Sequence, residues 1–297
     1  MALTKEANRS FYPTHLNPAG TMMDKSKQYL LNKIIQESTD YFGIRDSHFT
    51  FRVANTWHDD QSENWRWKEV ESHNDHNGKI LDMAAGVGTF LLYGLHQGYD
   101  VYGVEPEQWK LDYIRMKIEE KKYPQWYENR VIQAIGEDLP FPDNTFDFIT
   151  SYQTLEHVQN VEKCFDEMLR VLKPGGKLKI NAPDYRCWYE PHYLLPFMPK
   201  MNLTLAKIYL KCLARPVSGL TTLKWTTTPE ILSYIKKYDN VTYIDLTELY
   251  KERAINEIRQ TKSLPNFIAR LIYKLRQLKF IFRREKNINL VIRKSLT

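Results

Sequence analysis

Residues 79–90, KILDMAAGVGTF, place an acid and two closely spaced glycines in a chain with only 12 glycines among 297 residues. An apolar run ends near Asp82, and Gly86 and Gly88 follow in a loop of small residues. Glycine adopts backbone angles that other residues avoid, and it lets a ligand approach the main chain closely. A strand, a glycine-rich turn and a helix N-terminus together form a nucleotide-binding corner. The stretch therefore predicts a nucleotide-type cofactor.

Two common nucleotide chemistries fit this loop poorly. The dinucleotide motif G-x-G-x-x-G needs a third glycine where this chain has Leu91, which weakens a reading as an NAD enzyme without excluding it. The phosphate loop GxxxxGK[ST] is absent from the sequence, which argues against ATP or GTP chemistry.

Strands and helices alternate regularly around the glycine loop. We expect strands at 79–83, 100–105, 131–135, 146–152 and 177–183, and helices at 88–97, 106–122 and 161–173. Pro106 should take the first position of its helix, and residues 174–176, Pro-Gly-Gly, should end the third helix. This alternation predicts a parallel sheet with helices on both faces.

The flanking regions are less regular. Residues 24–42 have helical apolar spacing with Gly43 as a stop, whereas 44–77 give no clear element. The aromatic- and proline-rich residues 184–227 form an expected insertion. A helix at 228–238 and strands at 241–247 and 288–294 complete the pattern. The expected organisation is a 1–78 N-terminal extension, a core of 79–183 and 228–297, and the 184–227 insertion.

The motifs in this core resemble a known family. ILDMAAGVG resembles motif I of the class I S-adenosylmethionine-dependent methyltransferases, of the type 11-like kind. The similarity covers about 79–183 and continues through VYGVEPE, GEDLPFPDNTFDFI, SYQTLEHV and MLRVLKPGGKLKINAPD. LPFPDNTFD followed by LKPGGKL is far more specific than the glycines alone. The resemblance implies an α/β Rossmann-like fold with a mainly parallel seven-stranded sheet, and S-adenosylmethionine as cofactor.

The resemblance also implies cofactor contacts. Asp82 would order the loop and the methionine end of the cofactor, Gly86 and Gly88 would let the main chain approach it, and Glu105 would accept from both ribose hydroxyls, as in dinucleotide folds. The remaining implied cofactor residues are Ala84, Pro106, Gly136, Glu137, Asp138 and Gln153.

Two positions depart from the family pattern. Ala84 replaces the first glycine of motif I, which is tolerable if its backbone stays in an ordinary region. Ile135 stands where many relatives carry the acid that binds the adenine amino group. The adenine would then rest on backbone near Gly136, with Glu137 or Asp138 as a substitute acid.

Methyl transfer from a sulfonium needs alignment and removal of a proton from the acceptor. His157, after the fourth expected strand, is the candidate general base because the ordinary imidazole pKa lies near working pH; the alternative is that it only braces the loop. Gln153, Glu156 and His157 also resemble the ExxEH metal site of ubiquinone-pathway O-methyltransferases. Gln153 replaces an anionic ligand there, so no metal is expected.

A second candidate cluster lies in the sequence PDYRCWYEPHY and contains Asp184, Tyr185, Glu190 and His192, of which Asp184, Glu190 and His192 are candidate catalytic residues. Aromatic residues interleave with it: Trp188, Tyr189, Tyr193 and Phe197. Aromatic faces and carboxylates suit a sugar ring, although a lid with its own aromatic core is the alternative. EPHYLLPF also resembles methyltransferases of bacterial surface-glycan synthesis.

Charge is concentrated in one segment of the chain. The net charge is +6, but residues 262–286 carry eight Lys or Arg against one acid, so the rest is near neutral and a nucleic-acid partner is not expected. Apolar residues follow one helical stripe there, which predicts a basic amphipathic helix that either lies on an anionic membrane or docks on the domain.

The location and function follow as expectations. The three cysteines have no metal or disulfide spacing, and no signal peptide or 20-residue apolar span is present, so we expect a cytoplasmic protein. Peripheral contact at the inner membrane face is the alternative in which the basic helix meets lipid. We expect O-methylation of a glycan or sugar hydroxyl, on an acceptor that is lipid-linked if the basic helix meets membrane. The alternatives are a quinone or lipid precursor as acceptor, and a non-catalytic cofactor-binding scaffold.

Overall fold

The structure, a computed structural model, describes residues 23–73, 78–261, 265–278 and 286–296. Its main sheet has seven strands in the order β3-β2-β1-β4-β5-β9-β8. The strands are β1 (Ile80–Met83), β2 (Val101–Val104), β3 (Val131–Ile132), β4 (Phe146–Tyr152), β5 (Leu172–Pro183), β8 (Val241–Asp245) and β9 (Asn287–Lys294). Only β9 runs antiparallel to its neighbours, β5 and β8. The expected, mainly parallel seven-stranded sheet is confirmed.

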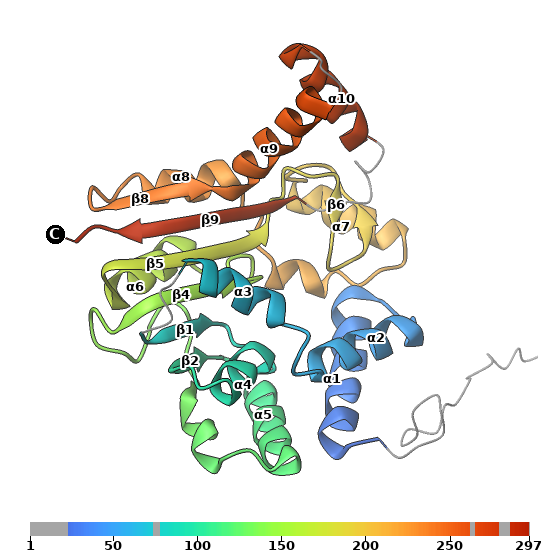
Figure 1. The fold of residues 1–297 in the computed structure, drawn as a ribbon. Helices are drawn as coiled ribbons and strands as arrows, with labels where there is room; N and C mark the ends of the chain where they lie inside the picture. Colours follow the sequence, from blue (N-terminus) through green and yellow to red (C-terminus); the bar gives the residue numbers. More distant parts are fainter. Residues whose placement is uncertain (1–22, 74–77, 262–264, 279–285, 297) are drawn as a thin grey trace, which may run out of the picture.

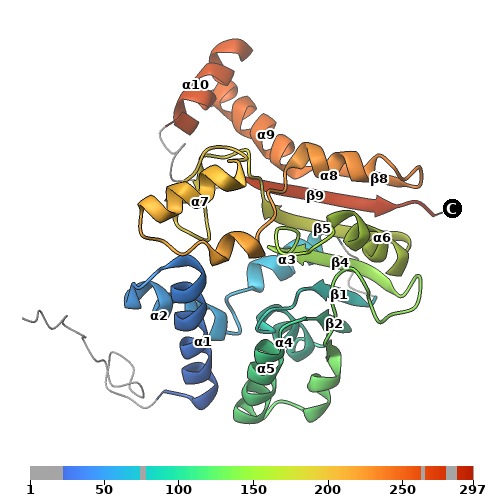
Figure 2. The same cartoon turned by 180° about the vertical axis from the view of Figure 1, so that it is seen from behind.

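The described helices of the core and its N-terminal flank are α1 (Lys25–Phe42), α2 (Ser47–His58), α3 (Asn64–His73), α4 (Thr89–His96), α5 (Gln108–Lys121), the 3₁₀ helix η1 (Gln125–Arg130), α6 (Val161–Val171) and α8 (Thr228–Ile235). They cover both faces of the sheet (Figures 1 and 2). One apolar core joins the sheet to α6 and α8, and a second joins it to α1 through α5. Both faces of the central strands are therefore buried, as parallel sheets require.

The N-terminal extension is part of the second core. Trp67 of α3 is 1% exposed and stacks on Phe90 and Tyr99, with ring centroids 4.3 Å apart in both pairs. Its indole N–H donates to the Phe90 carbonyl oxygen at 2.9 Å. Gly94 makes room for the ring, because a Cβ there would lie 2.0 Å from Trp67 Cζ2. Residues 64–73, which the sequence left without an element, thus form a helix anchored on the sheet.

The insertion at 184–227 forms a small lobe. It contains β6 (Tyr189–Glu190), β7 (Leu195–Pro196), α7 (Leu203–Cys212) and the 3₁₀ helix η2 (Ser218–Thr222). This lobe packs against the end of α1: the rings of Phe42 and Tyr193 are 5.2 Å apart, and Arg215 donates to the Gly43 carbonyl oxygen. Two segments far apart in the sequence therefore meet beside the carboxyl ends of the strands (Figures 1 and 2).

Several expected boundaries were wrong. Pro106 precedes the cap of its helix, because Glu107 is the N-cap and α5 begins at Gln108. Helix α6 ends at Val171 and β5 begins directly at Leu172, so the Pro-Gly-Gly segment lies within that strand. Strand β3 has two residues, so 133–135 belong to the loop after it.

The basic segment also differs from the expected single helix. The structure places α9 (Leu246–Thr261), which the sequence did not reveal, before a shorter α10 (Asn266–Leu278). Residues 262–264 and 279–285 of the expected helix lie outside the described residues. The two helices pack through Ile255, Ile258 and Ala269 and project beyond the sheet (Figure 1). Among the described residues, no helix is both long and apolar enough to cross a bilayer.

Candidate functional site

The glycine loop links β1 to α4 at the carboxyl edge of the sheet. Ala84, Gly86 and Gly88 have φ angles of 55°, 57° and 73°. The expectation of an ordinary backbone at Ala84 was wrong, because its φ lies in the left-handed region. That conformation costs a non-glycine residue about 1 kcal/mol. A Cβ at Gly88 would lie 2.9 Å from Ile114, whereas nothing lies within 4 Å at Gly86. The loop thus packs on α5 at one glycine and leaves open space at the other.

Glu105 follows β2 and is 1% exposed. Its carboxylate accepts from the Gly86 N–H at 2.8 Å and from the Glu107 N–H at 3.0 Å, and Lys110 Nζ lies 3.6 Å away. Burial raises the pKa of Glu105, and Lys110 and the two N–H groups oppose that rise. Each carboxylate oxygen has a further lone pair for a ligand hydroxyl. The structure therefore brings Glu105 and the glycine loop together. Pro106, next to it, is exposed.

Asp82 is buried at the end of β1 and pairs with an arginine that sequence reasoning missed. Arg66 of α3 donates to the Asp82 carboxylate at 2.7 Å, and its guanidinium lies 4.2 Å from the ring centroids of both Phe90 and Tyr152. Burial raises the pKa of Asp82 to about 6, although Arg66 opposes this. The place of Arg66 between Trp65 and Trp67 was the available signal, but the extension had no motif to connect it with Asp82.

The residues expected near the adenine differ in burial. Glu137 is buried, and its Oε1 accepts from the N–H groups of Gln159 and Asn160 at 2.7 and 2.9 Å, so it braces the loop after β4. Asp138 is exposed, and Ile135 is 52% exposed. A Cβ on Gly136 would lie 2.8 Å from Cys164 Sγ. Glu137 is thus a loop anchor, which disfavours it as the adenine-binding acid.

On the acceptor side, the loop after β4 and the insertion converge. One ligand-type atom from each of Glu156, His157 and His192 lies within 4.8 Å of the other two. The Glu156 side chain is fully buried, whereas His157 is 42% exposed, and the two imidazole rings are 5.1 Å apart. Gln153 is not in this cluster; it is exposed, has φ 51°, and its N–H donates to the Asn181 carbonyl oxygen.

The pKa of His157 lies below the ordinary imidazole value that the sequence suggested. Desolvation, with repulsion from His192 as a second cause, lowers its pKa to about 4. The imidazole is therefore neutral at neutral pH but is a weaker base than an ordinary histidine. The expectation of a pKa near working pH was wrong.

The other two candidate catalytic residues support the local structure. Glu190 is fully buried; it binds His192 Nδ1 at 2.7 Å and accepts from the Tyr193 N–H at 2.5 Å. Asp184 accepts from Arg186 and from the Thr228 hydroxyl, which lower the pKa of Asp184 against the effect of burial. Glu190 therefore positions His192, and Asp184 joins the end of β5 to α8. These contacts argue against either carboxylate as general base.

The insertion aromatics are mostly core. Tyr193 and Phe197 are 0% and 5% exposed in an apolar cluster with Leu210 and Leu220, whereas Trp188 is 38% exposed. The alternative of a lid with its own core is therefore correct for Tyr193 and Phe197. They present no face to a sugar ring.

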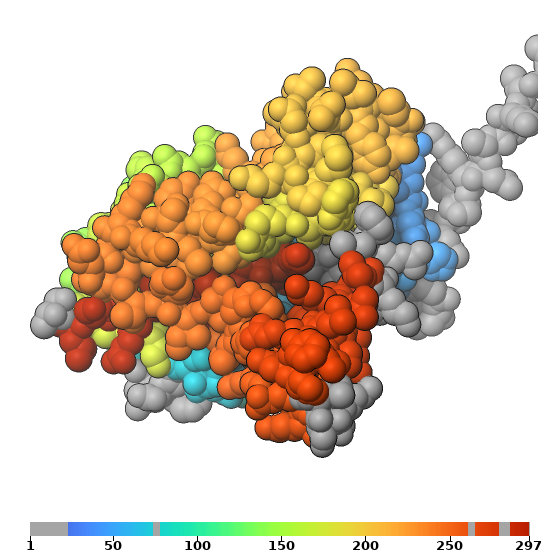
Figure 3. Space-filling model, turned by 90° about the horizontal axis from the view of Figure 1, so that it is seen from above, coloured from blue at the N-terminus to red at the C-terminus, as the bar shows by residue number. Residues whose placement is uncertain are grey.

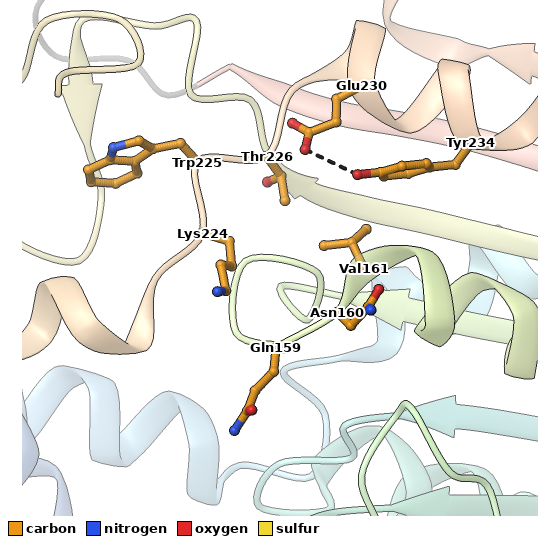
Figure 4. Close-up of a pocket in the computed structure, with 8 residues that line it drawn as sticks. All are labelled: Gln159, Asn160, Val161, Lys224, Trp225, Thr226, Glu230 and Tyr234. Atoms are coloured by element: carbon orange, nitrogen blue, oxygen red, sulfur yellow. Dashed lines mark hydrogen bonds between the residues drawn. The ribbon is translucent and has the colours of Figure 1, made fainter. Parts of the chain in front are cut away.

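A cavity of about 270 Å³ lies between the start of α6 and the segment that leads into α8 (Figure 4). Residues from the start of α6, the segment before α8, and α8 itself line it: Gln159, Asn160, Val161, Lys224, Trp225, Thr226, Glu230 and Tyr234. Glu230 accepts from the Tyr234 hydroxyl there at 3.3 Å. None of the expected cofactor or catalytic residues lines the cavity.

Comparison with known proteins gives the family. A methyltransferase-domain family model matches residues 81–180. The demethylmenaquinone methyltransferase of Symbiobacterium thermophilum is 33% identical over 207 residues, covering 66% of this chain and 76% of that protein. The enzyme of the same name from Anoxybacillus flavithermus is 27% identical over 193 residues, covering 60% and 76%.

Solved structures agree on the fold. A phosphoethanolamine N-methyltransferase of Haemonchus contortus, in complex with S-adenosylhomocysteine, matches with a TM-score of 0.51 at 16% identity, covering 90% of this chain and 60% of that chain. The [4+2]-cyclase SpnF matches with a TM-score of 0.50 at 16% identity, covering 92% and 97%. One fold thus carries different reactions, so the reaction is assigned from the sequence family. This chain belongs to the class I S-adenosylmethionine-dependent methyltransferases: it is an enzyme that uses S-adenosylmethionine.

Proposed function

We propose that the enzyme methylates a membrane-associated, quinone-type precursor. The observation that carries this acceptor class is the similarity to demethylmenaquinone methyltransferases over 66% of the chain. The burial of Tyr193 and Phe197 supports the change from the sugar acceptor that the sequence favoured, because a sugar ring needs accessible aromatic faces.

For the cofactor, we propose that it lies over the carboxyl ends of β1 and β2. Glu105 would accept from the ribose hydroxyls, and the open space beside Gly86 would admit the cofactor to the main chain. Asp82, held by Arg66, would attract the methionine ammonium group. Ile135, half exposed after β3, would pack against the adenine, with backbone groups near Gly136 binding its edge.

For the acceptor, we propose a place beside Glu156, His157 and His192. Methyl transfer is an in-line displacement in which the acceptor atom bonds to the methyl carbon while the C–S bond of the sulfonium breaks, and the acceptor loses one proton. The roof of this place would be the insertion and the end of α1, which pack together through Phe42 and Tyr193. This roof would exclude water and align the acceptor with the methyl group.

We also propose that α10 brings the enzyme to anionic membrane. Its outward residues Phe267, Leu271, Leu275 and Leu278 are 72%, 54%, 55% and 57% exposed. Lys274 and Arg276 are exposed on the same helix. The helix lies on the face seen from above in Figure 3. An apolar stripe with adjacent cations is complementary to an anionic bilayer, where each cation contributes about 1 kcal/mol.

A competition between acceptors tests the proposed function. The full chain, methyl-labelled S-adenosylmethionine and anionic vesicles would be incubated with a prenylated hydroquinone and a lipid-linked sugar together. The proposal predicts label in the hydroquinone. Label confined to the sugar would overturn it and support glycan methylation.

A further inference from the structure

Glu156, His157 and His192 have the composition and spacing of a metal site. One ligand-type atom of each lies within 4.8 Å of the other two. Ligand atoms bound to one ion at about 2.1 Å lie roughly 3–4 Å apart, so the three side chains need only a small inward movement. We propose that they bind one divalent transition-metal ion. Gln153 occupies the sequence position where the third ligand was expected, and the insertion supplies His192 instead.

Both imidazoles are oriented as metal ligands are. His157 Nδ1 lies 3.1 Å from the carbonyl oxygen of Thr222, and His192 Nδ1 lies 2.7 Å from the carboxylate of Glu190. A metal-bound histidine almost always donates its second ring N–H to such an acceptor, which fixes the tautomer and the ring plane. Nε2 is then the ligand atom of each ring, and His157 Nε2 lies 4.0 Å from Glu156 Oε1.

The charge of the surroundings favours a cation. Glu156 and Glu190 are both fully buried, one inside the cluster and one behind His192. Buried carboxylates are stable when they are paired or bound to metal. A divalent ion beside Glu156 would be attracted by both carboxylates and would leave the Glu190–His192 contact in place.

The ligand set indicates which ion. Two imidazoles and one carboxylate suit Zn²⁺, Fe²⁺ or Co²⁺, whereas Mg²⁺ and Ca²⁺ prefer oxygen ligands. Three protein ligands leave an open coordination position, as in catalytic sites. The role of the ion rests on the proposed function: it would bind a hydroxyl of the hydroquinone and lower the pKa of that hydroxyl, so that its proton leaves to water and the anionic ring is a stronger nucleophile toward the methyl group.

Cobalt titration tests the site without acceptor or cofactor. The full chain, stripped with chelator, would be titrated with Co²⁺ while the visible absorption is recorded. The proposal predicts one equivalent of bound Co²⁺ with a four- or five-coordinate spectrum, displaced by Zn²⁺. Failure of the parent protein to bind one equivalent overturns the proposal, whatever the variants do.

Variants then locate the ion. His192→Gln and Glu156→Gln should weaken Co²⁺ binding at least tenfold, and Glu190→Gln should weaken it 10- to 100-fold through His192. His48→Gln, at an exposed position of α2, is the matched control and should bind as the parent does. Unchanged affinity in a folded His192→Gln variant would contradict the site. The titration contains no acceptor, so it tests the metal site alone. If the protein binds Co²⁺ but does not label the hydroquinone in the acceptor competition, the proposed acceptor is overturned and the metal site stands.

Discussion

Replacing Glu105 with alanine should weaken S-adenosylhomocysteine binding about 10- to 150-fold. The carboxylate is 1% exposed and already fixed by the N–H groups of Gly86 and Glu107, at 2.8 and 3.0 Å. Its geometry is therefore set before the ribose binds, so ordering the Glu105 side chain costs little free energy on binding. Hydrogen bonds to a charged group contribute about 1.5–3 kcal/mol, and about 1.4 kcal/mol corresponds to a tenfold change in Kd.

Isothermal titration calorimetry of S-adenosylhomocysteine measures this change directly. Glu107→Gln is the matched control, because it alters one acid two residues away whose side chain is 45% exposed and pairs with Lys110. The control should bind within twofold of the parent. Thermal unfolding of Glu105→Ala should be recorded as well, since the Gly86 N–H loses its acceptor. A folded Glu105→Ala variant with parental affinity would refute the proposed ribose contact.

Three further predictions address the charges. Because burial raises the pKa of Asp82 to about 6, its carboxylate is lost below that pH, and S-adenosylhomocysteine affinity should fall by up to about tenfold per pH unit there and stay level above it. Asp82→Asn should remove this dependence; a parental profile that is level from pH 5 to 7 would contradict it. Arg66→Met should lower the free energy of unfolding in urea by about 3 kcal/mol, since it leaves a buried carboxylate without its guanidinium, and adding Asp82→Asn should restore part of the loss. A combined Lys274→Gln and Arg276→Gln variant should float less with anionic liposomes than the parent at low salt, and equal recovery would mean that α10 does not bind membrane through charge.

The core of the fold was predictable because its signals are local. The run before Asp82 is apolar, the glycine loop follows it, and Glu105 ends the next strand, so the order of strand, turn and helix can be read from adjacent residues. Gly43 ends α1 with φ 66°, as a helix C-cap glycine does. The family resemblance implied the mainly parallel seven-stranded sheet, whereas the strand order and the antiparallel β9 came from the structure.

The features that could not be predicted from the sequence depend on contacts between distant segments. Arg66 is 16 residues before Asp82, and only the packing of α3 on the sheet brings them together. His192 reaches His157 because the insertion folds around Tyr193, and no spacing in the sequence encodes that approach. The left-handed backbone of Ala84 is likewise imposed by the loop and opposed by the residue type.

Single-turnover methyl transfer shows whether the enzyme passes the methyl group of S-adenosylmethionine to a quinone-type acceptor. The enzyme, loaded with one equivalent of methyl-labelled S-adenosylmethionine on anionic vesicles, would be mixed with excess prenylated hydroquinone, quenched and extracted into organic solvent. We expect the label to pass into the organic phase as the methylated hydroquinone, while unlabelled S-adenosylhomocysteine stays in the aqueous phase. Label that remains in S-adenosylmethionine, although the enzyme binds the cofactor at full occupancy, would contradict the account.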